Sequence, residues 1–146
     1  MRRIDPQTNR VIAELPVGPY RGPTDIHFVD GAIWVLGERY DHDGAVVTRI
    51  DARTNLIAAT IALKRNFGLQ TPVLWNRGIW VSTFVRAAGG LHNVLVKIDP
   101  QTNQVVDQIA VSARVASPLP GQGLASGEGA LWALNGCFLF RLAVAN

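Results

Sequence analysis

One seven-residue phrase occurs three times in this chain, and this repetition constrains the fold more than any other feature. It reads RIDPQTN at residues 3–9, RIDARTN at 49–55 and KIDPQTN at 97–103, a period of about 46 to 48 residues. A second phrase keeps the same period and contains a tryptophan each time: DGAIWV at 30–35, NRGIWV at 76–81 and EGALWA at 128–133. Two landmarks in fixed order predict a repeat protein in which similar units pack on their neighbours.

Each unit has the pattern of short strands. Apolar and polar residues alternate in runs such as 45–50 and 103–109, and clusters of Gly, Pro, Asn and Asp bound these runs. No stretch keeps the helical spacing of apolar residues over the ten or more positions that a helix needs. We therefore expect an all-β chain with little or no helix. In the first full unit the four expected strands, called A to D, are 25–30, 33–39, 46–51 and 56–62.

The first phrase also predicts the turn between strands C and D. An aspartate side chain accepts backbone N–H groups two or three residues further on, proline presets φ, and asparagine tolerates the left-handed conformation. Asp5, Pro6 and Asn9 supply all three features in the first copy of the phrase. For the turn between strands A and B, the glycines near each tryptophan are the expected markers: Gly31, Gly78 and Gly129.

Four short strands in a period of about 40 to 50 residues are typical of a β-propeller blade, a sheet arranged radially around a channel. The chain is then one domain of about three blades, with units of about 25–62, 71–111 and 123–146, the last completed by residues 1–17. Aromatic side chains bury large areas, so Trp34, Trp80 and Trp132 are expected to pack between neighbouring blades.

The segments GAIWVLG (31–37), GALWALN (129–135) and KIDPQTNQVV (97–106) resemble the repeats of the YVTN and virginiamycin B lyase-like β-propellers. The resemblance covers nearly the whole chain and implies the propeller fold. It leaves the activity open, because those propellers include lyases, sensor domains and binding domains. The lyases use a histidine base and acidic residues that hold magnesium, and no set of residues in this sequence matches that arrangement.

Three blades are too few to close a ring, since propellers have about four to eight. The chain opens with C-like residues 2–5 and a D strand at 11–16, whereas the third unit has A, B and C strands without a D. We therefore expect strand exchange in a homodimer that closes a six-bladed ring. Residues 11–16, which begin at Val11, would supply the D strand to residues 138–144 of the other copy, which begin at Phe138. The alternative is that the chain is a piece of a longer propeller.

Composition limits the compartments and partners that we expect for this protein. The 146 residues are 48% hydrophobic and contain no run of 18 apolar residues and no secretory signal, so we expect a cytoplasmic protein without a membrane partner, although proteins with this repeat are often exported. Cys137 is the only cysteine, which excludes an intrachain disulfide. Nucleic acid is not an expected partner, because the sequence lacks a spaced array of Lys and Arg.

The net charge is only +3, but basic residues are expected to gather at one edge of the ring and acidic residues at the other. In a propeller the D-to-A and B-to-C loops share one edge, and the A-to-B and C-to-D turns share the other. The candidate ligand-binding residues, basic residues of the first edge and histidines near it, are Arg21, His27, Arg39, His42, Lys64, Arg65, Arg86, His92 and Arg114. A basic edge attracts a small anionic ligand or an acidic protein; the alternative is that these residues only keep the surface soluble.

Asp25 and His27 are the candidates for catalysis. Their i, i+2 spacing puts both side chains on one face of strand A, where they could hold a divalent metal or act as acid and base. The sequence favours a non-catalytic binding module without a cofactor. The alternatives are a metal-assisted lyase or hydrolase that uses this pair, and a purely structural module.

Overall fold

The computed structural model of the chain describes residues 1–18, 20–40, 44–64, 66–88, 90–111, 122–135 and 138–143. All regular elements in these segments are strands, which confirms the all-β prediction. No helix long and apolar enough to cross a membrane occurs in the segments described. The predictions for His42, Arg65, Arg114 and Cys137 fall outside the described residues.

The described strands form four antiparallel sheets, and strands that are neighbours in sequence are neighbours in each sheet. The hairpin contains β1 (Arg2–Asp5) and β2 (Arg10–Glu14). The first sheet contains β3 (Tyr20–Val29), β4 (Ala32–Arg39), β5 (Gly44–Asp51) and β6 (Ile57–Lys64). The second sheet contains β7 (Asn66–Trp75), β8 (Gly78–Ala87), β9 (Gly90–Asp99) and β10 (Gln104–Ala110). The third sheet contains β11 (Gln122–Gly127), β12 (Ala130–Asn135) and β13 (Phe138–Ala143).

These strands lie close to the expected ones, with differences at their ends. Strands β3 and β7 begin at Tyr20 and Asn66, earlier than the expected starts at 25 and 71. Arg21, Lys64 and His92, which were expected in loops, lie in β3, β6 and β9. Sequence periodicity locates the centre of a strand better than its ends, because backbone pairing continues past the last alternating residue.

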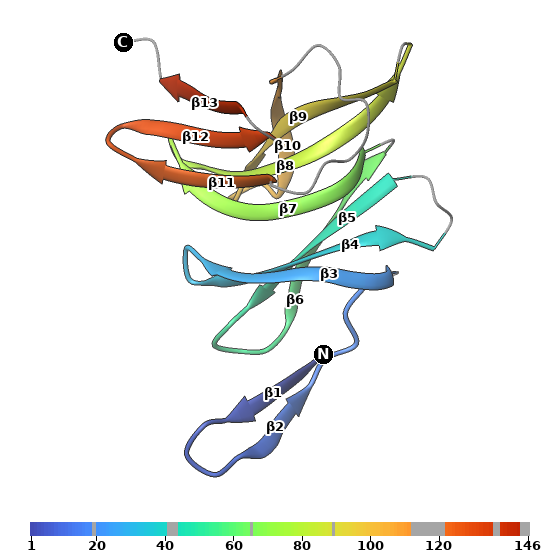
Figure 1. The fold of residues 1–146 in the computed structure, drawn as a ribbon. Coiled ribbons are helices and arrows are strands. Elements are labelled where there is room, and N and C mark those ends of the chain that lie inside the picture. The colour runs from blue at the N-terminus through green and yellow to red at the C-terminus, as the bar shows by residue number, and fades with distance from the viewer. Residues whose placement is uncertain are drawn as a thin grey trace.

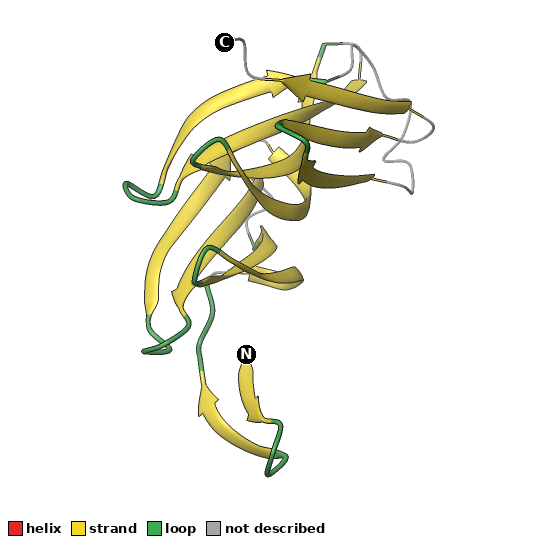
Figure 2. Cartoon of the chain, turned by 90° about the vertical axis from the view of Figure 1, so that its left-hand side faces the viewer, coloured by secondary structure: helices red, strands yellow, loops and turns green. Residues whose placement is uncertain are grey.

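The sheets stack face to face in chain order, with the hairpin at one end and the third sheet at the other (Figures 1 and 2). Trp34 and Leu36 of the first sheet pack against Ile79 and Val81 of the second in a fully buried core. We call the face of each sheet that carries the repeated tryptophan its forward face, and the opposite face its backward face. Each forward face therefore covers the backward face of the next sheet.

The same arrangement recurs at the other two interfaces. Trp80 and Leu95 on the forward face of the second sheet pack against Leu124 and Leu131 of the third. The hairpin contributes Leu15 to a smaller core on the backward face of the first sheet, where Val35, Val46 and Ile50 are buried. Burial of these apolar side chains is the main force that holds the stack together.

The buried position predicted for the three tryptophans is correct for two of them. Trp34 and Trp80 are 0% and 2% exposed. Trp132 is only partly buried within this chain, so its packing against a neighbouring blade stays a prediction. Trp132 lies on the forward face of the third sheet, and no described segment covers that face.

The repeated aspartate turn is confirmed in all three copies. The Asp5, Asp51 and Asp99 carboxylates accept the backbone N–H groups of Gln7, Arg53 and Gln101 at 2.8–2.9 Å. The asparagine that ends each turn is left-handed, with φ of 54° at Asn9, 60° at Asn55 and 58° at Asn103. These hydrogen bonds stabilise the carboxylate form, so the pKa of each aspartate is lowered; the largest contributions come from the backbone N–H groups of Gln7, Thr54 and Gln101 respectively.

These lowered pKa values predict acid sensitivity. Since the folded pKa lies below the unfolded one, the stabilisation is complete above the pKa of the unfolded carboxyl, near pH 4, and is lost as the pH falls through the folded pKa. We expect the urea midpoint to fall between about pH 5 and pH 2. The fall should be smaller in a triple variant, Asp5→Asn, Asp51→Asn and Asp99→Asn, since amide oxygens still accept these bonds but do not titrate. Equal falls in both proteins would contradict this account.

The turns between the A and B strands correct one prediction. Gly31 and Gly129 have φ of 71° and 68° and occupy the left-handed turn position as expected. Gly78 does not, because it is the first residue of β8 and pairs with Trp75. Arg77, with φ of 57°, takes the turn position in the second sheet. Aligning the tryptophans shows why, since Gly78 corresponds to Ala32 and Ala130 in the other sheets.

Candidate functional site

The repeated tryptophan, the cation opposite it and the aspartate turn of the next sheet form one connected unit. The Trp34 indole N–H donates to the Val29 carbonyl at 3.2 Å, and the Arg49 guanidinium lies 5.7 Å from the Trp34 ring centroid. Arg49 also donates to the Pro100 carbonyl at 2.6 Å and to Asn103 Oδ1 at 3.3 Å, in the turn of the second sheet. We call this tryptophan, its cation and the two acceptors of the next turn a clamp, and it joins neighbouring sheets.

Other copies of the clamp are incomplete. Lys97 lies 5.8 Å from the Trp80 ring and Arg141 lies 5.6 Å from the Trp132 ring, but neither donates a hydrogen bond to any residue the structure describes. Arg3 shows the opposite case. It donates to the Ala52 carbonyl at 3.1 Å and to Asn55 Oδ1 at 2.9 Å, whereas no tryptophan ring lies beneath it in the described part of the chain.

The structure places the described members of the predicted basic rim at one edge of the stacked sheets. Strand pairing puts Tyr20 opposite Arg39 and Val85 opposite His92, so the start of β3, the end of β4, the end of β8 and the start of β9 share this edge. We call the following residues the cationic edge: Arg21, Arg39, Lys64, Arg86 and His92. Arg21 and Arg86 are exposed, and Arg39 is partly buried. Glu38 lies beside them and reduces the positive charge.

His92 is the member whose environment differs most from expectation. Its Nε2 atom is shielded from solvent and has no hydrogen-bond partner among the described residues. The next residue, Asn93, is buried and donates from Nδ2 to Ser82 Oγ at 3.2 Å. His92 therefore lies at the margin of a polar part of the second sheet, not in a solvated loop.

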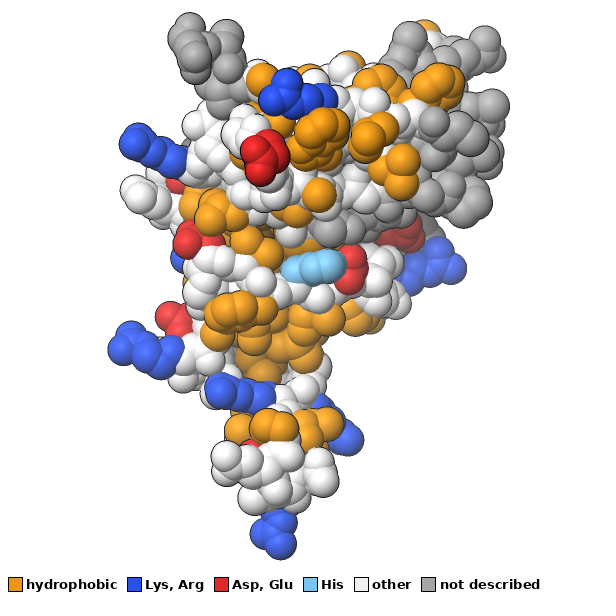
Figure 3. Space-filling view, turned by 60° about the vertical axis from the view of Figure 1, so that its left-hand side comes forward, with side chains coloured by type: hydrophobic (Ala, Val, Ile, Leu, Met, Phe, Trp, Pro, Cys, Tyr) orange, Lys and Arg blue, Asp and Glu red, His pale blue; other side chains and the backbone are white. Residues whose placement is uncertain are grey.

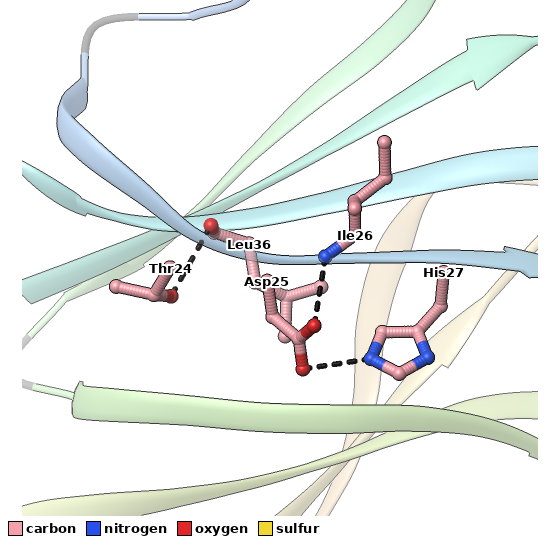
Figure 4. Close-up of polar contacts among 5 residues, drawn as sticks. All are labelled: Thr24, Asp25, Ile26, His27 and Leu36. Carbon is pink, nitrogen blue, oxygen red and sulfur yellow. Dashed lines mark hydrogen bonds and ion pairs between the residues drawn. The ribbon is translucent and has the colours of Figure 1, made fainter.

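Asp25 and His27 lie together on β3, as their spacing predicts (Figure 4). His27 Nε2 is 2.7 Å from Asp25 Oδ2, a close polar contact that does not have the geometry of a well-directed hydrogen bond. Asp25 Oδ1 accepts the Ile26 backbone N–H at 2.9 Å, which fixes the carboxylate. Both side chains share a face with Trp34 and Leu36, their partners across the strands, so they point toward the second sheet and remain about one third exposed.

Two grooves were not predicted from the sequence. One, of about 620 Å³, lies at the edge opposite the cationic edge and is lined in part by Asp30, Trp75, Arg77 and Gln101. Two features of the sequence could have indicated this groove. Trp75 is out of phase with the repeat and contacts the Trp80 ring, and Arg77 replaces a turn glycine. This groove combines opposite charges with an aromatic ring.

The second groove, of about 330 Å³, is more apolar and lies between the hairpin and the first sheet, lined in part by Met1, Val17, Pro23 and Ile26. It is continuous with exposed apolar side chains, and Figure 3 shows such side chains gathered over the middle and lower part of one face of the molecule. The exposed apolar residues of the hairpin and β3 are Ile4, Val11, Ile12, Ile26 and Phe28.

In the segments that the structure describes, no three or more His, Cys, Asp or Glu side chains are grouped closely enough to hold a metal ion. Asp25 and His27 alone provide two donors of such a set.

No protein-family model matches the chain, and no curated protein matches it.

Proposed function

We propose that the chain is a non-catalytic binding module of the β-propeller type, that two copies close one six-bladed ring, and that the cationic edge of this ring binds an anionic group. The group is a carboxylate or phosphate, presented by a small molecule or by an acidic protein surface. The observation that carries the proposal is that the two ends of the stack expose faces whose counterparts inside the stack are buried.

The arrangement of the sheets supports propeller blades. Each sheet follows the order of the chain, and the first strands of successive sheets lie against one another, with β7 contacting both β3 and β11. First strands side by side are what a radial arrangement around a channel requires. On this proposal Asp25 and His27, on β3, lie close to the channel.

The exposed faces argue for a second copy. Ile26, on the backward face of the first sheet, is 54% exposed, whereas its counterparts Pro72 and Leu124 are buried. At the other end, Trp132 is partly exposed where Trp34 and Trp80 are buried. At the two junctions inside the stack, a forward face with such a tryptophan covers the backward face of the next sheet. The forward face of the third sheet is therefore suited to cover the backward face of the first sheet of another copy. Docking one on the other in both copies closes a ring by two-fold symmetry.

The strand edges complement each other in the same way. Strand β13 has the exposed apolar residues Phe138 and Leu139 and an unpaired outer edge in the described chain, and such an edge is a template for another strand. We propose that β2 of the second copy provides that strand, as strand D of the third sheet. In the structure β2 pairs with β1 of its own chain, so the exchange requires β2 to change partner.

Charge reversal tests the proposed binding. We expect the wild-type chain to bind a glutamate-rich peptide or inorganic phosphate in titration calorimetry at low ionic strength, and we expect Arg21→Glu with Arg86→Glu to weaken binding by about tenfold or more, since both residues are exposed on the cationic edge. The matched control is Arg10→Glu with Arg53→Glu, which changes the same charge at exposed positions near the opposite edge.

The outcomes separate the possibilities. Binding of phosphate alone indicates a small anion, and binding of the peptide alone indicates an acidic protein surface. Failure of the wild type to bind either probe, or equal losses in the two double variants, would contradict a specific cationic site.

The contact between Asp25 and His27 favours one second candidate, a metal-assisted lyase or hydrolase. Divalent metal bound by the purified protein in stoichiometric amount, and lost in Asp25→Asn, would favour this enzyme over the binding module.

A further inference from the structure

We propose that strand β1 of each chain and strand β13 of a second copy compete for the same place. This place has two parts. One is the inner edge of β2, which is the edge that pairs with β1 in the structure. The other is the cation site formed by the Ala52 carbonyl and Asn55 Oδ1. When the ring closes, Arg141 of the second copy replaces Arg3 in this site. The inference rests on the proposed ring and specifies how its junction forms.

The complete clamp shows what the site is built to hold. At the junction of the first and second sheets, one arginine, Arg49, contacts the Trp34 ring and also reaches the Pro100 carbonyl and the Asn103 side chain. The aromatic face orients the guanidinium, and the planar group then donates to two acceptors of the next turn.

Arg3 and Arg141 each have one half of this clamp. Arg3 has the acceptors, Ala52 and Asn55, without a described tryptophan beneath it. Arg141 has the tryptophan, Trp132, without an acceptor among the described residues. Arg141 lies opposite Trp132 as Arg49 lies opposite Trp34, and Arg3 holds the same place as Arg49 in the repeated seven-residue phrase. Bringing Arg141 of one copy to Ala52 and Asn55 of another rebuilds the complete clamp.

The two strands differ in how firmly their own chain holds them. Strand β1 spans Arg2–Asp5, and its pairing with β2 is interrupted by an irregularity between Arg3 and Ile4. Its ion pair, Arg2 with Glu14, is highly exposed and therefore contributes little. Strand β13 pairs with β12 at every position from Phe138 to Ala143, and its Phe140 and Leu142 pack against the core between the second and third sheets. β1 is therefore held less firmly than β13. The contacts that must break when it leaves β2 are the two Arg3 hydrogen bonds and the two backbone hydrogen bonds between Met1 and Leu15.

This competition gives β1 a protective role in the free chain. While β1 covers the inner edge of β2, that edge is not available for pairing with other chains. The second copy supplies a longer strand and covers Ile26 at the same time, which offsets the loss of β1. Assembly is then reversible and depends on concentration.

Substitutions at Arg3 and Arg141 test the inference, because they are expected to change the dimer dissociation constant in opposite directions. Sedimentation equilibrium measures this constant. Methionine keeps an apolar stem and removes the guanidinium. We expect Arg141→Met to raise the dissociation constant about tenfold, in line with the loss of charged hydrogen bonds. We expect Arg3→Met to lower it about threefold, because β1 then competes less well. The matched control, Arg53→Met, lies in the same turn as the acceptors and should stay within about twofold.

Hydrogen exchange provides an independent readout. On dimerisation the backbone amides of β1 should lose protection while those of β13 gain it. If Arg3→Met and Arg141→Met both raise the dissociation constant, β1 stays in place in the ring; the displacement is then wrong although the ring stands. An unchanged constant in Arg141→Met also overturns the inference. A wild-type chain that remains monomeric at all concentrations overturns the ring and the inference together.

Discussion

Replacing Trp34 by alanine is expected to lower the free energy of unfolding by about 3–5 kcal/mol. The side chain is 0% exposed and fills the core between the first and second sheets. Alanine leaves a cavity there, removes the indole N–H bond to the Val29 carbonyl and leaves Arg49 without its aromatic contact. A domain of this size has a total stability of about 5–15 kcal/mol, so this loss is a large share of the total. Urea denaturation followed by circular dichroism measures the change.

Trp132→Ala is the matched control, since it removes the same residue from the same place in the repeat. Trp132 is only partly buried, and its N–H bond to the Gly127 carbonyl is exposed. At concentrations too low for the proposed dimer to form, this variant should lose at most about 2 kcal/mol. Equal losses in the two variants would show that the forward face of the third sheet is covered as completely as that of the first.

Ile26→Glu is expected to abolish dimerisation, raising the dissociation constant by at least about 100-fold. Ile26 is 54% exposed on the backward face of the first sheet, so a charge is tolerated in the free chain. In the proposed ring this residue is covered by the third sheet of the second copy, as its counterparts Pro72 and Leu124 are covered inside the stack, and an unpaired carboxylate is costly there. The urea midpoint of the monomer should therefore remain close to that of the wild type.

Val106→Glu serves as the control for this experiment. Val106 is also an exposed apolar residue, but it lies on β10, the outer strand of the second sheet, away from both ends of the stack. This variant should dimerise like the wild type. Dimerisation of Ile26→Glu with an unchanged constant would mean that the copies associate through a different surface.

Local chemistry made much of the fold predictable from the sequence. The aspartate turn depends on contacts between residues two to four positions apart, such as Asp99 with Gln101 and Asn103, so its geometry follows from the phrase itself. Alternation of apolar and polar residues identified the strands for the same reason, because the side chains of a strand alternate between its two faces.

Features that depend on distant segments were not predictable. Arg49 reaches the turn at Pro100, and nothing in the periodicity indicates that the two meet. The exposure of Trp132 depends on whether another sheet covers it, and the similar sequences of the three units cannot reveal this. His92 was expected near the loops of the first edge, but pairing with Val85 continues β9 across this position. The candidate pair Asp25 and His27 was found because its geometry is local to one strand.

The clamp gives the stack a direction. Arg3 and Arg49 each reach from their own unit into the following one, and in neither case does the described contact run the other way. Both of these junctions present an arginine on one side and a backbone carbonyl with an asparagine side chain on the other. A whole unit could thus be duplicated or deleted in evolution without redesign of its neighbours, and the number of units in such a protein can change in single steps.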